Sequence, residues 1–285
     1  MNADSAFIIG ATHVVCQDYA TAGDTWTSKQ VPGPNSTGSP YIIMSDGCSS
    51  SANCDIGARL LVKAAEQFLA RFQPMATMLT ELHRESARRA LCWATLAGLT
   101  PQAVDATLLT AHLSDGELIL GCSGDGVIAL QSWTGALDVY AISYPTGYPF
   151  YPGYAHQPER LLGLQNGVSK TIDHFRCDSG ADTLRLEESS TSVSPTEVFR
   201  AKAADYKHGL LISDGIHSFF TTKLTETSKR VEDIPMQRII KDLISFKSVR
   251  GAFVGRRLRI FLKECQSKGW QHRDDLAIGA LHLGD

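Results

Sequence analysis

The region between residues 105 and 143 places the tightest limit on how this chain can fold. Short apolar runs are separated there by three pairs that end in glycine, namely Asp115-Gly116, Asp125-Gly126 and Thr134-Gly135. An Asp-Gly pair between two apolar runs is a strong signal for a hairpin, because both residues tolerate the backbone angles of a tight turn. We therefore predict three or four consecutive antiparallel strands in this region.

The segments on either side fall into blocks of strand and blocks of helix. Apolar residues over 55–72 recur at three-to-four-residue spacing, which is typical of an amphipathic helix. Further helices are expected from Pro74 to about Leu96, over 234–246 and over 252–265, and further strands over 5–9, 41–45, 208–212 and 275–283. Separate blocks of helix and antiparallel strand favour an α+β layered architecture over an alternating parallel one.

Three segments are predicted to be irregular. Residues 21–40 are rich in Gly, Pro, Ser and Thr and are expected to form a loop or a poorly ordered hairpin tip. Residues 144–164 are rich in Pro, Tyr and Gly, and the polar stretch 179–204 is expected to be an insertion of low order. The chain is thus predicted to be one domain over 1–285, with irregular insertions near 144–164 and 179–204.

Composition excludes several classes of function. The chain has 285 residues, 43% of them hydrophobic, and a net charge of −3, so no general basic field attracts nucleic acid or an anionic membrane. No apolar run approaches the roughly 18 residues of a membrane-spanning helix. The first residues lack the basic and long apolar segments of a signal peptide. The seven scattered cysteines are therefore expected to be reduced thiols of a cytoplasmic protein.

Acidic residues follow or precede several of the predicted strands. YIIMSDG and LLISDGI are both apolar runs that end in Ser-Asp-Gly, at Asp46 and Asp214, and Asp274-Asp275 stands just before the apolar run LAIGALHL. Asp18 follows the apolar stretch around Val15. Carboxylates gathered at one sheet edge repel one another unless a cation neutralises them, and hard divalent cations prefer oxygen ligands. A single Asp-Gly pair is usually only a turn, as we interpret Asp115-Gly116, so spacing alone leaves metal binding and turn formation both open.

The order of these motifs resembles that of a known family, the PP2C-like (PPM) metal-dependent serine/threonine phosphatases, and in particular their bacterial branch. The matching stretches span the chain from about residue 8 to 283: GATHVVCQDYA, IIMSDGCSSSANCDIGARLLV, DATLLTAHL, LILGCSGDGVIAL, LLISDGIHSF and RDDLAIGALHL. The resemblance implies a four-layer αββα sandwich, in which two antiparallel sheets are flanked by helices.

The resemblance also implies a site and a reaction. Two or more Mn²⁺ or Mg²⁺ ions would be held by Asp46, the Gly47 carbonyl, Asp214, Asp274, Asp18 and Asp125, with Asp46 bridging two ions and Asp18 holding metal-bound water. The implied reaction is hydrolysis of phosphoserine and phosphothreonine in proteins by a two-metal-activated water. The implied partners are a phosphorylated protein substrate and a cognate serine/threonine kinase, with no nucleic acid and no membrane.

Two positions depart from the family pattern. An arginine that binds phosphate in many members is replaced by His13, which could contact phosphate as a cation or simply be a half-buried strand residue. The histidine that serves as general acid in the animal enzymes is replaced by Cys48, a poor proton donor to an alkoxide, so that water would protonate the leaving group. The expected catalytic residues are therefore Asp18, Asp46 and His13.

Two other functions remain compatible with the sequence. A pseudophosphatase would bind a phosphorylated partner without turnover, and a two-metal phosphatase could act on small phosphorylated metabolites. The aromatic loop 144–163 is a candidate for binding substrate through Tyr148, Phe150 and Tyr151, although the same rings could serve only to pin the loop to the domain.

Overall fold

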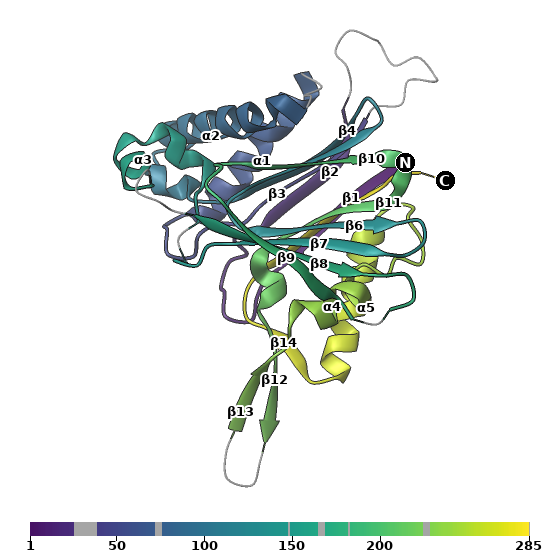
Figure 1. Ribbon diagram of the computed structural model, residues 1–285. Coiled ribbons are helices and arrows are strands. Elements are labelled where there is room, and N and C mark those ends of the chain that lie inside the picture. Colours follow the sequence, from purple (N-terminus) through teal and green to yellow (C-terminus); the bar gives the residue numbers. More distant parts are fainter. Residues whose placement is uncertain are drawn as a thin grey trace.

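The computed structural model describes residues 1–25, 39–71, 76–147, 149–164, 169–181, 183–224 and 229–284. Two antiparallel sheets form its centre and helices cover their outer faces (Figure 1). The predicted α+β class and four-layer αββα sandwich are thereby confirmed. Among the described residues, no helix is both long and apolar enough to cross a membrane.

The larger sheet has seven strands in the order β1-β15-β11-β6-β7-β8-β9. Their bounds are β1 Asn2–Ile8, β15 Leu276–His282, β11 Tyr206–Ile212, β6 Gly126–Ser132, β7 Leu137–Ser143, β8 Lys170–Cys177 and β9 Arg185–Ser192. The second sheet has the order β10-β5-β4-β3-β2, with bounds β10 Glu197–Lys202, β5 Glu117–Ser123, β4 Leu108–Ser114, β3 Ser39–Ser45 and β2 Tyr19–Thr25. Three or four strands were predicted within 105–143, and the structure has four there, β4 to β7.

The central strands are buried on both faces, which explains why they are predominantly apolar. Along β6, Val127 and Ala129 pack in the cluster that lies under the helices, whereas Ile128 and Leu130 pack in the cluster between the two sheets. Successive side chains of a strand point to opposite faces, so one strand supplies both layers. The inter-sheet core therefore joins the two sheets directly.

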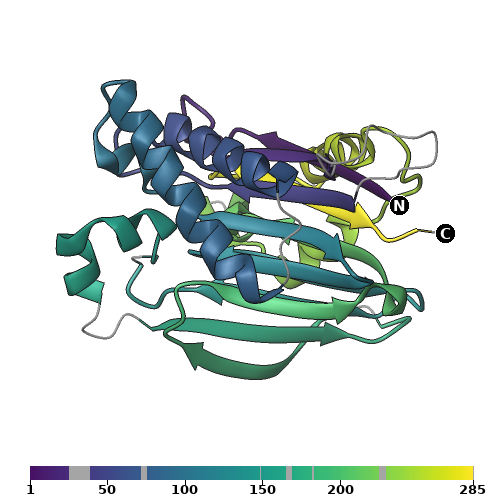
Figure 2. The same ribbon diagram turned by 90° about the horizontal axis from the view of Figure 1, so that it is seen from above.

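One helical pair covers each outer face (Figures 1 and 2). Helices α1 (Cys54–Arg71) and α2 (Leu79–Leu96) pack against the five-stranded sheet through a shared cluster that includes Leu61 and Leu82. Helices α4 (Met236–Leu243) and α5 (Phe253–Ser267) cover the seven-stranded sheet in a cluster that includes Ile240 and Phe261. The four predicted helices are confirmed, with α2 and α4 shorter than expected.

A small third sheet was not foreseen. It contains β13 (Lys229–Asp233), β12 (Phe219–Leu224) and β14 (Trp270–His272), and it projects below the sandwich in Figure 1. The described residues also form five short 3-10 helices: η1 (Ala76–Met78), η2 (Pro101–Val104), η3 (Pro152–His156), η4 (Ala203–Asp205) and η5 (Asp214–His217).

The three segments predicted to be irregular need correction. Residues 19–25 form β2, and 26–38 lie outside the described residues. Within 144–164 the chain forms η3 and a short helix, α3 (Pro158–Leu164). The polar stretch 179–204 is not of low order, because it supplies β9 and β10, the edge strands of the two sheets. An edge strand is held by backbone pairing and faces solvent, so its side chains are polar and show no apolar pattern from which a strand could be predicted.

Two helical glycines offer a test of how tightly the layers are packed. A Cβ on Gly57 in α1 would lie 1.6 Å from the carbonyl oxygen of Ala103, whereas a Cβ on Gly255 in α5 would meet only the Cβ of Ala6, at 3.8 Å. We expect Gly57→Ala to lower the free energy of unfolding by about 2 kcal/mol or more, because backbone must move. Gly255→Ala should leave it unchanged or raise it by up to about 1 kcal/mol, since alanine favours helix.

Urea denaturation followed by circular dichroism measures both changes. Equal stability of the two variants would contradict the close packing of α1 on η2.

Candidate active site

Antiparallel pairing brings the predicted acidic residues to one edge of the sandwich. Asp46 follows the last residue of β3, and Asp18 precedes the first residue of β2, which pairs with that end of β3. On the other sheet, Ile212 at the end of β11 pairs with Val127 near the start of β6 and with Ile278 near the start of β15. Asp214, Asp125 and Asp274 therefore leave their strands at the same edge.

The two Ser-Asp-Gly motifs are built alike but use their serines differently. The hydroxyl of Ser45 donates to the Thr107 carbonyl at 2.5 Å. The hydroxyl of Ser213 donates to Asp18 Oδ2 at 2.7 Å and accepts from the Ala277 amide at 2.9 Å. Ser213 thus ties the second Ser-Asp-Gly motif, at the end of β11, to Asp18, which precedes β2 of the other sheet.

The glycine of each motif is required by a close backbone approach. A Cβ on Gly47 would lie 2.8 Å from the Cys54 carbonyl at the start of α1, and a Cβ on Gly215 would lie 1.7 Å from the Asp275 carbonyl. Neither contact leaves room for a side chain. These glycines let each aspartate sit close to the neighbouring segment.

Asp18 is the most buried of these acidic residues, which we call the carboxylate cluster (Asp18, Asp46, Asp125, Asp214 and Asp274). It is 1% exposed, and its Oδ1 has no hydrogen-bond partner among the described residues. Burial and repulsion from Asp214 and Asp275 raise its pKa to about 7, although hydrogen bonds with Asp46 and Ser213 favour the charged form. An orphaned, buried carboxylate oxygen is the kind of atom that a cation satisfies.

Burial and like charges also raise the pKa values of the neighbouring carboxylates. Burial and repulsion from Asp18 and Asp214 raise the pKa of Asp46 well above its usual value. Burial and repulsion from Asp214 raise the pKa of Asp125 to about 7, although its own backbone hydrogen bond lowers it. The same two causes raise the pKa of Asp274. These carboxylates repel one another, and the positive charge that His13 brings to Asp274 only partly offsets that repulsion.

This donor set fits divalent cations by its chemistry. All the groups are hard oxygen donors, which Mg²⁺ and Mn²⁺ prefer. Within the described part of the chain, no three His, Cys, Asp or Glu side chains converge closely enough to form a ready-made metal cage. The repulsion among these carboxylates is nevertheless what a bound cation would offset, so the donor set fits a divalent cation.

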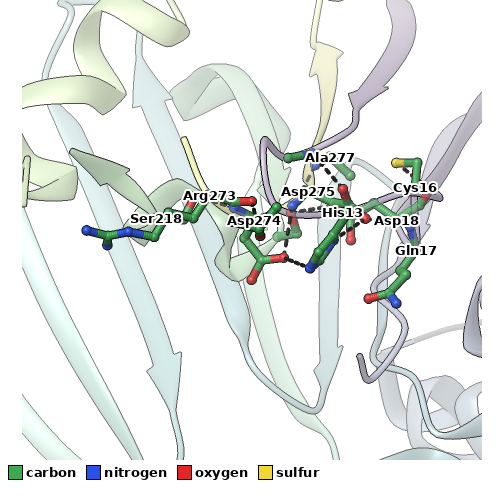
Figure 3. A network of polar contacts seen from close by, with 12 residues as sticks. His13, Cys16, Gln17, Asp18, Ser218, Arg273, Asp274, Asp275 and Ala277 are labelled. Atoms are coloured by element: carbon green, nitrogen blue, oxygen red, sulfur yellow. Dashed lines mark hydrogen bonds and ion pairs between the residues drawn. The ribbon is translucent and has the colours of Figure 1, made fainter. Parts of the chain in front are cut away.

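The two adjacent aspartates before β15 have different surroundings (Figure 3). Asp275 is buried, and its Oδ1 and Oδ2 accept from the amides of Gly10 at 2.7 Å and Gln17 at 2.5 Å. The Asp274 side chain is 46% exposed, and its Oδ1 accepts only from the Asp275 amide at 2.9 Å among the described residues. Asp275 therefore fastens the opening motif to the sheet, and Asp274 retains oxygen lone pairs for a ligand.

His13 lies against both of these aspartates. Its Nδ1 is 3.1 Å from Asp275 Oδ2, and its Nε2 is 3.5 Å from Asp274 Oδ1. The first contact is close enough for an ion pair but does not satisfy hydrogen-bond geometry. Burial lowers the pKa of His13, but the pull of Asp275, Asp274 and Asp18 outweighs it, so the net shift is upward. The predicted phosphate contact of His13 stays a prediction.

Comparison with known proteins adds to this geometry. Residues 11–148 match the family model of protein phosphatase 2C, a stretch that includes His13, Asp18, Asp46 and Asp125. The serine/threonine phosphatase Stp1 from Staphylococcus aureus superposes with a TM-score of 0.57 at 10% identity, with 100% of this chain and 96% of that chain covered. Residues 11–148 are therefore similar to protein phosphatase 2C, and the whole chain shares its fold with Stp1.

Two further solved structures share the fold at low identity. One is the Mycobacterium tuberculosis serine/threonine phosphatase PstP/Ppp, with a TM-score of 0.53, 13% identity and full coverage of both chains. The other is the catalytic domain of PstP in complex with two manganese ions, with a TM-score of 0.50, 13% identity and coverage of 98% and 96%. A search of curated proteins gives no match.

A pocket opens beside the carboxylate cluster. It encloses about 490 Å³ and is lined by Cys48, Ser50, Ser51, Ala52, Thr100, Gln102, Asp105, Gly147, Pro149, Tyr151, Tyr154 and Arg160. Arg160 Nη1 donates to Asp105 Oδ1 at 2.6 Å, and its guanidinium lies 4.7 Å from the centre of the Tyr154 ring. This salt bridge ties α3 to the end of η2.

The aromatic residues of this loop differ in what they contact. Tyr151 is 7% exposed and hydrogen-bonded to Cys48, so it packs the loop against the motif that carries Asp46. Phe150 and Tyr151 both contact the Tyr154 ring edge-on, at 6.1 Å and 5.4 Å. Tyr148 lies outside the described residues.

Several residues that support the site had no predicted role. Ser213 holds Asp18, the Thr107 hydroxyl accepts from the Asp46 amide at 3.0 Å, and Asp275 holds the opening motif. The repeated serine in the two Ser-Asp-Gly motifs was a signal for Ser213. Nothing in the sequence marked Asp105 and Arg160 as partners, because 55 residues separate them.

The repulsion among the carboxylates predicts that loss of one negative charge stabilises the folded protein. With divalent cations chelated at pH 8, Asp18→Asn should raise the free energy of unfolding by about 1 kcal/mol or more, because it removes a buried like charge and keeps an acceptor for Ser213. A raised pKa in the folded state weakens stability above that pKa. The advantage of the variant should therefore shrink as pH falls below about 7, the folded pKa of Asp18.

Thermal melts with and without Mn²⁺ measure the effect. Mn²⁺ should raise the melting temperature of the natural protein more than that of Asp18→Asn. A variant that is less stable than the natural protein in chelator, at every pH, would contradict this account of the cluster.

Proposed function

We propose that this chain is a metal-dependent phosphatase that hydrolyses phosphoserine and phosphothreonine in proteins. The observation that carries the proposal is the group of mutually repelling carboxylates at one edge of the sandwich, around Asp18, Asp46 and Asp214. The PP2C family match over residues 11–148 and the similarity in fold to bacterial serine/threonine phosphatases support the same reaction.

The chain's own residues would divide the work. Asp46, Asp214, Asp274 and the Gly47 carbonyl would hold the cations, with Asp18 and Asp125 as further acidic neighbours. When bound, two such cations neutralise charge on the phosphoryl group and activate the attacking water. Ser213 orients Asp18, because its hydroxyl fixes one carboxylate oxygen, while Oδ1 has no hydrogen-bond partner among the described residues.

His13 and Cys48 decide how this site differs from the family pattern. A cationic His13 beside Asp274 places positive charge at the rim of the cluster, where a phosphate would approach. Burial raises the pKa of Cys48, but hydrogen bonds with Ser50 and Tyr151 outweigh it, so the net shift is downward. We propose that water, rather than Cys48, protonates the leaving alkoxide.

Removal of a principal ligand tests the proposed activity. Asp46→Ala and Asp214→Ala should each lower Mn²⁺-dependent hydrolysis of p-nitrophenyl phosphate by at least about 100-fold, because each removes charge that holds the cations. Asp115→Asn is the matched control, since Asp115 sits in a turn with φ of 50° at the opposite end of β4 and β5. Its activity should equal that of the natural protein.

The possible outcomes separate the candidate functions. A natural protein that binds phosphopeptide but shows no turnover at any Mn²⁺ concentration would be a pseudophosphatase. Near-natural turnover in Asp46→Ala would overturn the assignment of ligands.

The pocket beside Cys48 gives a prediction about substrate class. We propose that it receives residues that flank the phosphorylated serine or threonine, because it adjoins the Asp46 motif and is walled by aromatic rings. Tyr154→Ala should lower kcat/KM for a phosphopeptide by about tenfold and leave p-nitrophenyl phosphate unaffected, since that substrate is too small to reach the ring.

Trp133→Ala is the control, because Trp133 is an aromatic residue that is 47% exposed and directly follows the far end of β6. Equal losses on both substrates together with a lower melting temperature would show that Tyr154 only packs the loop.

A further inference from the structure

The helical layer over the seven-stranded sheet differs in charge from the rest of the molecule. Residues 236–268, which include α4 and α5, contain nine Lys and Arg and two Asp and Glu, a net charge of +7. The remainder of the chain contains 18 basic and 28 acidic residues, a net charge of −10. The overall charge of −3 therefore conceals one strongly basic segment.

Much of this positive charge faces solvent without a carboxylate beside it. In the described part of the chain, five exposed side chains form no ion pair within 4.0 Å: Lys247, Arg250, Arg256, Arg259 and Lys263. Arg256 and Arg259 donate instead to backbone carbonyls, those of Arg250 at 2.5 Å and Gly255 at 3.2 Å. These contacts fix the side chains but leave their charge uncompensated.

An apolar hollow lies within this basic surface. It measures about 100 Å³ and is lined by Phe246, Phe253 and Ile260 together with Ser245, Lys247, Ser248, Arg256 and Arg257. The Phe246 and Phe253 rings meet edge-on at 5.0 Å, and Ile260 is 47% exposed at the rim. The surface formed by this hollow and its charged rim is called the α5 patch below.

The size of the hollow limits what can occupy it. It is much smaller than the roughly 300 Å³ or more of a typical small-molecule site, but it is of the size that one apolar side chain fills. A lipid surface would be met by large apolar side chains that protrude, and Ile260 is the only exposed large hydrophobic residue among residues 236–268. A concave apolar hollow inside a basic rim instead matches a projecting apolar residue with acidic neighbours.

We propose that the α5 patch docks an acidic segment of a partner protein, with one apolar side chain of that segment seated in the hollow. The basic rim steers the acidic segment and the hollow holds it, so that charge sets the rate of encounter and the anchor sets the lifetime. None of these residues belongs to the carboxylate cluster, so docking and hydrolysis are separate properties of the chain.

A defined peptide tests the proposal. A fluorescein-labelled peptide of about ten residues, made of Asp and Glu with one central Leu, is titrated with the full chain and followed by fluorescence anisotropy. It should bind about tenfold more tightly than the same peptide with a central Gly, and raising salt from about 50 mM to about 300 mM should weaken binding markedly. Failure of the natural protein to bind the Leu peptide would overturn the proposal.

Variants locate the binding surface. Arg256→Glu should weaken binding about tenfold or more, and Ile260→Asp should remove the preference for Leu over Gly. Arg88→Glu is the matched control, because Arg88 is exposed on α2 in the opposite helical layer, and it should bind as the natural protein does. Unchanged binding by Arg256→Glu, or an equal loss in Arg88→Glu, would show that the α5 patch is not the site.

Two further measurements separate this proposal from others. Circular dichroism melts and p-nitrophenyl phosphate hydrolysis should be the same for Arg256→Glu as for the natural protein, so a failure of the proposed phosphatase activity leaves the docking result readable. Binding to vesicles with about one-third phosphatidylglycerol that is lost in Arg256→Glu, without binding of the Leu peptide, would assign the patch to membrane lipid and overturn the protein-docking proposal.

Discussion

The repulsion among buried carboxylates at one edge of the sandwich is the constraint on which the rest of this structure depends. Asp18, Asp46 and Asp125 have raised pKa values because water is excluded and like charges lie nearby. Such a cluster is unfavourable for an isolated protein, so the surrounding fold must hold it in place. The inter-sheet core, which joins the two sheets along their length, is what fixes both edges relative to each other.

The hydrogen bonds around the cluster divide into those that fix backbone and those that leave oxygens available. Asp275 uses both carboxylate oxygens on amides of the opening motif, while Asp18 uses one on Ser213 and leaves the other unpartnered among the described residues. Aspartate therefore serves two purposes in this part of the structure. A saturated carboxylate positions the chain, whereas a partly satisfied one can accept a cation.

The two helical layers also differ in what they offer to solvent. Exposed arginines on α2 pair with glutamates one turn away, as Arg84 does with Glu81 and Arg88 with Glu85. Several arginines and lysines on and before α5 have no such partner among the described residues. Local pairing makes the surface of α2 nearly neutral. The unpaired side chains around α5 leave a positive electrostatic field that reaches about a Debye length into solvent.

The sequence alone determined the strands and helices of the centre and the identity of the acidic residues. Predominantly apolar runs marked strands buried on both faces, and Asp-Gly pairs marked their turns, because these depend on a few neighbouring residues. Strand β8, the polar edge strands β9 and β10 and the small third sheet were not predicted, since backbone pairing with a distant strand holds them and no local pattern records it. Likewise, both aspartates before β15 were visible in the sequence, but only tertiary structure could show that Asp275 is consumed by the amides of Gly10 and Gln17. That difference rests on contacts across more than 250 residues, which no local pattern encodes.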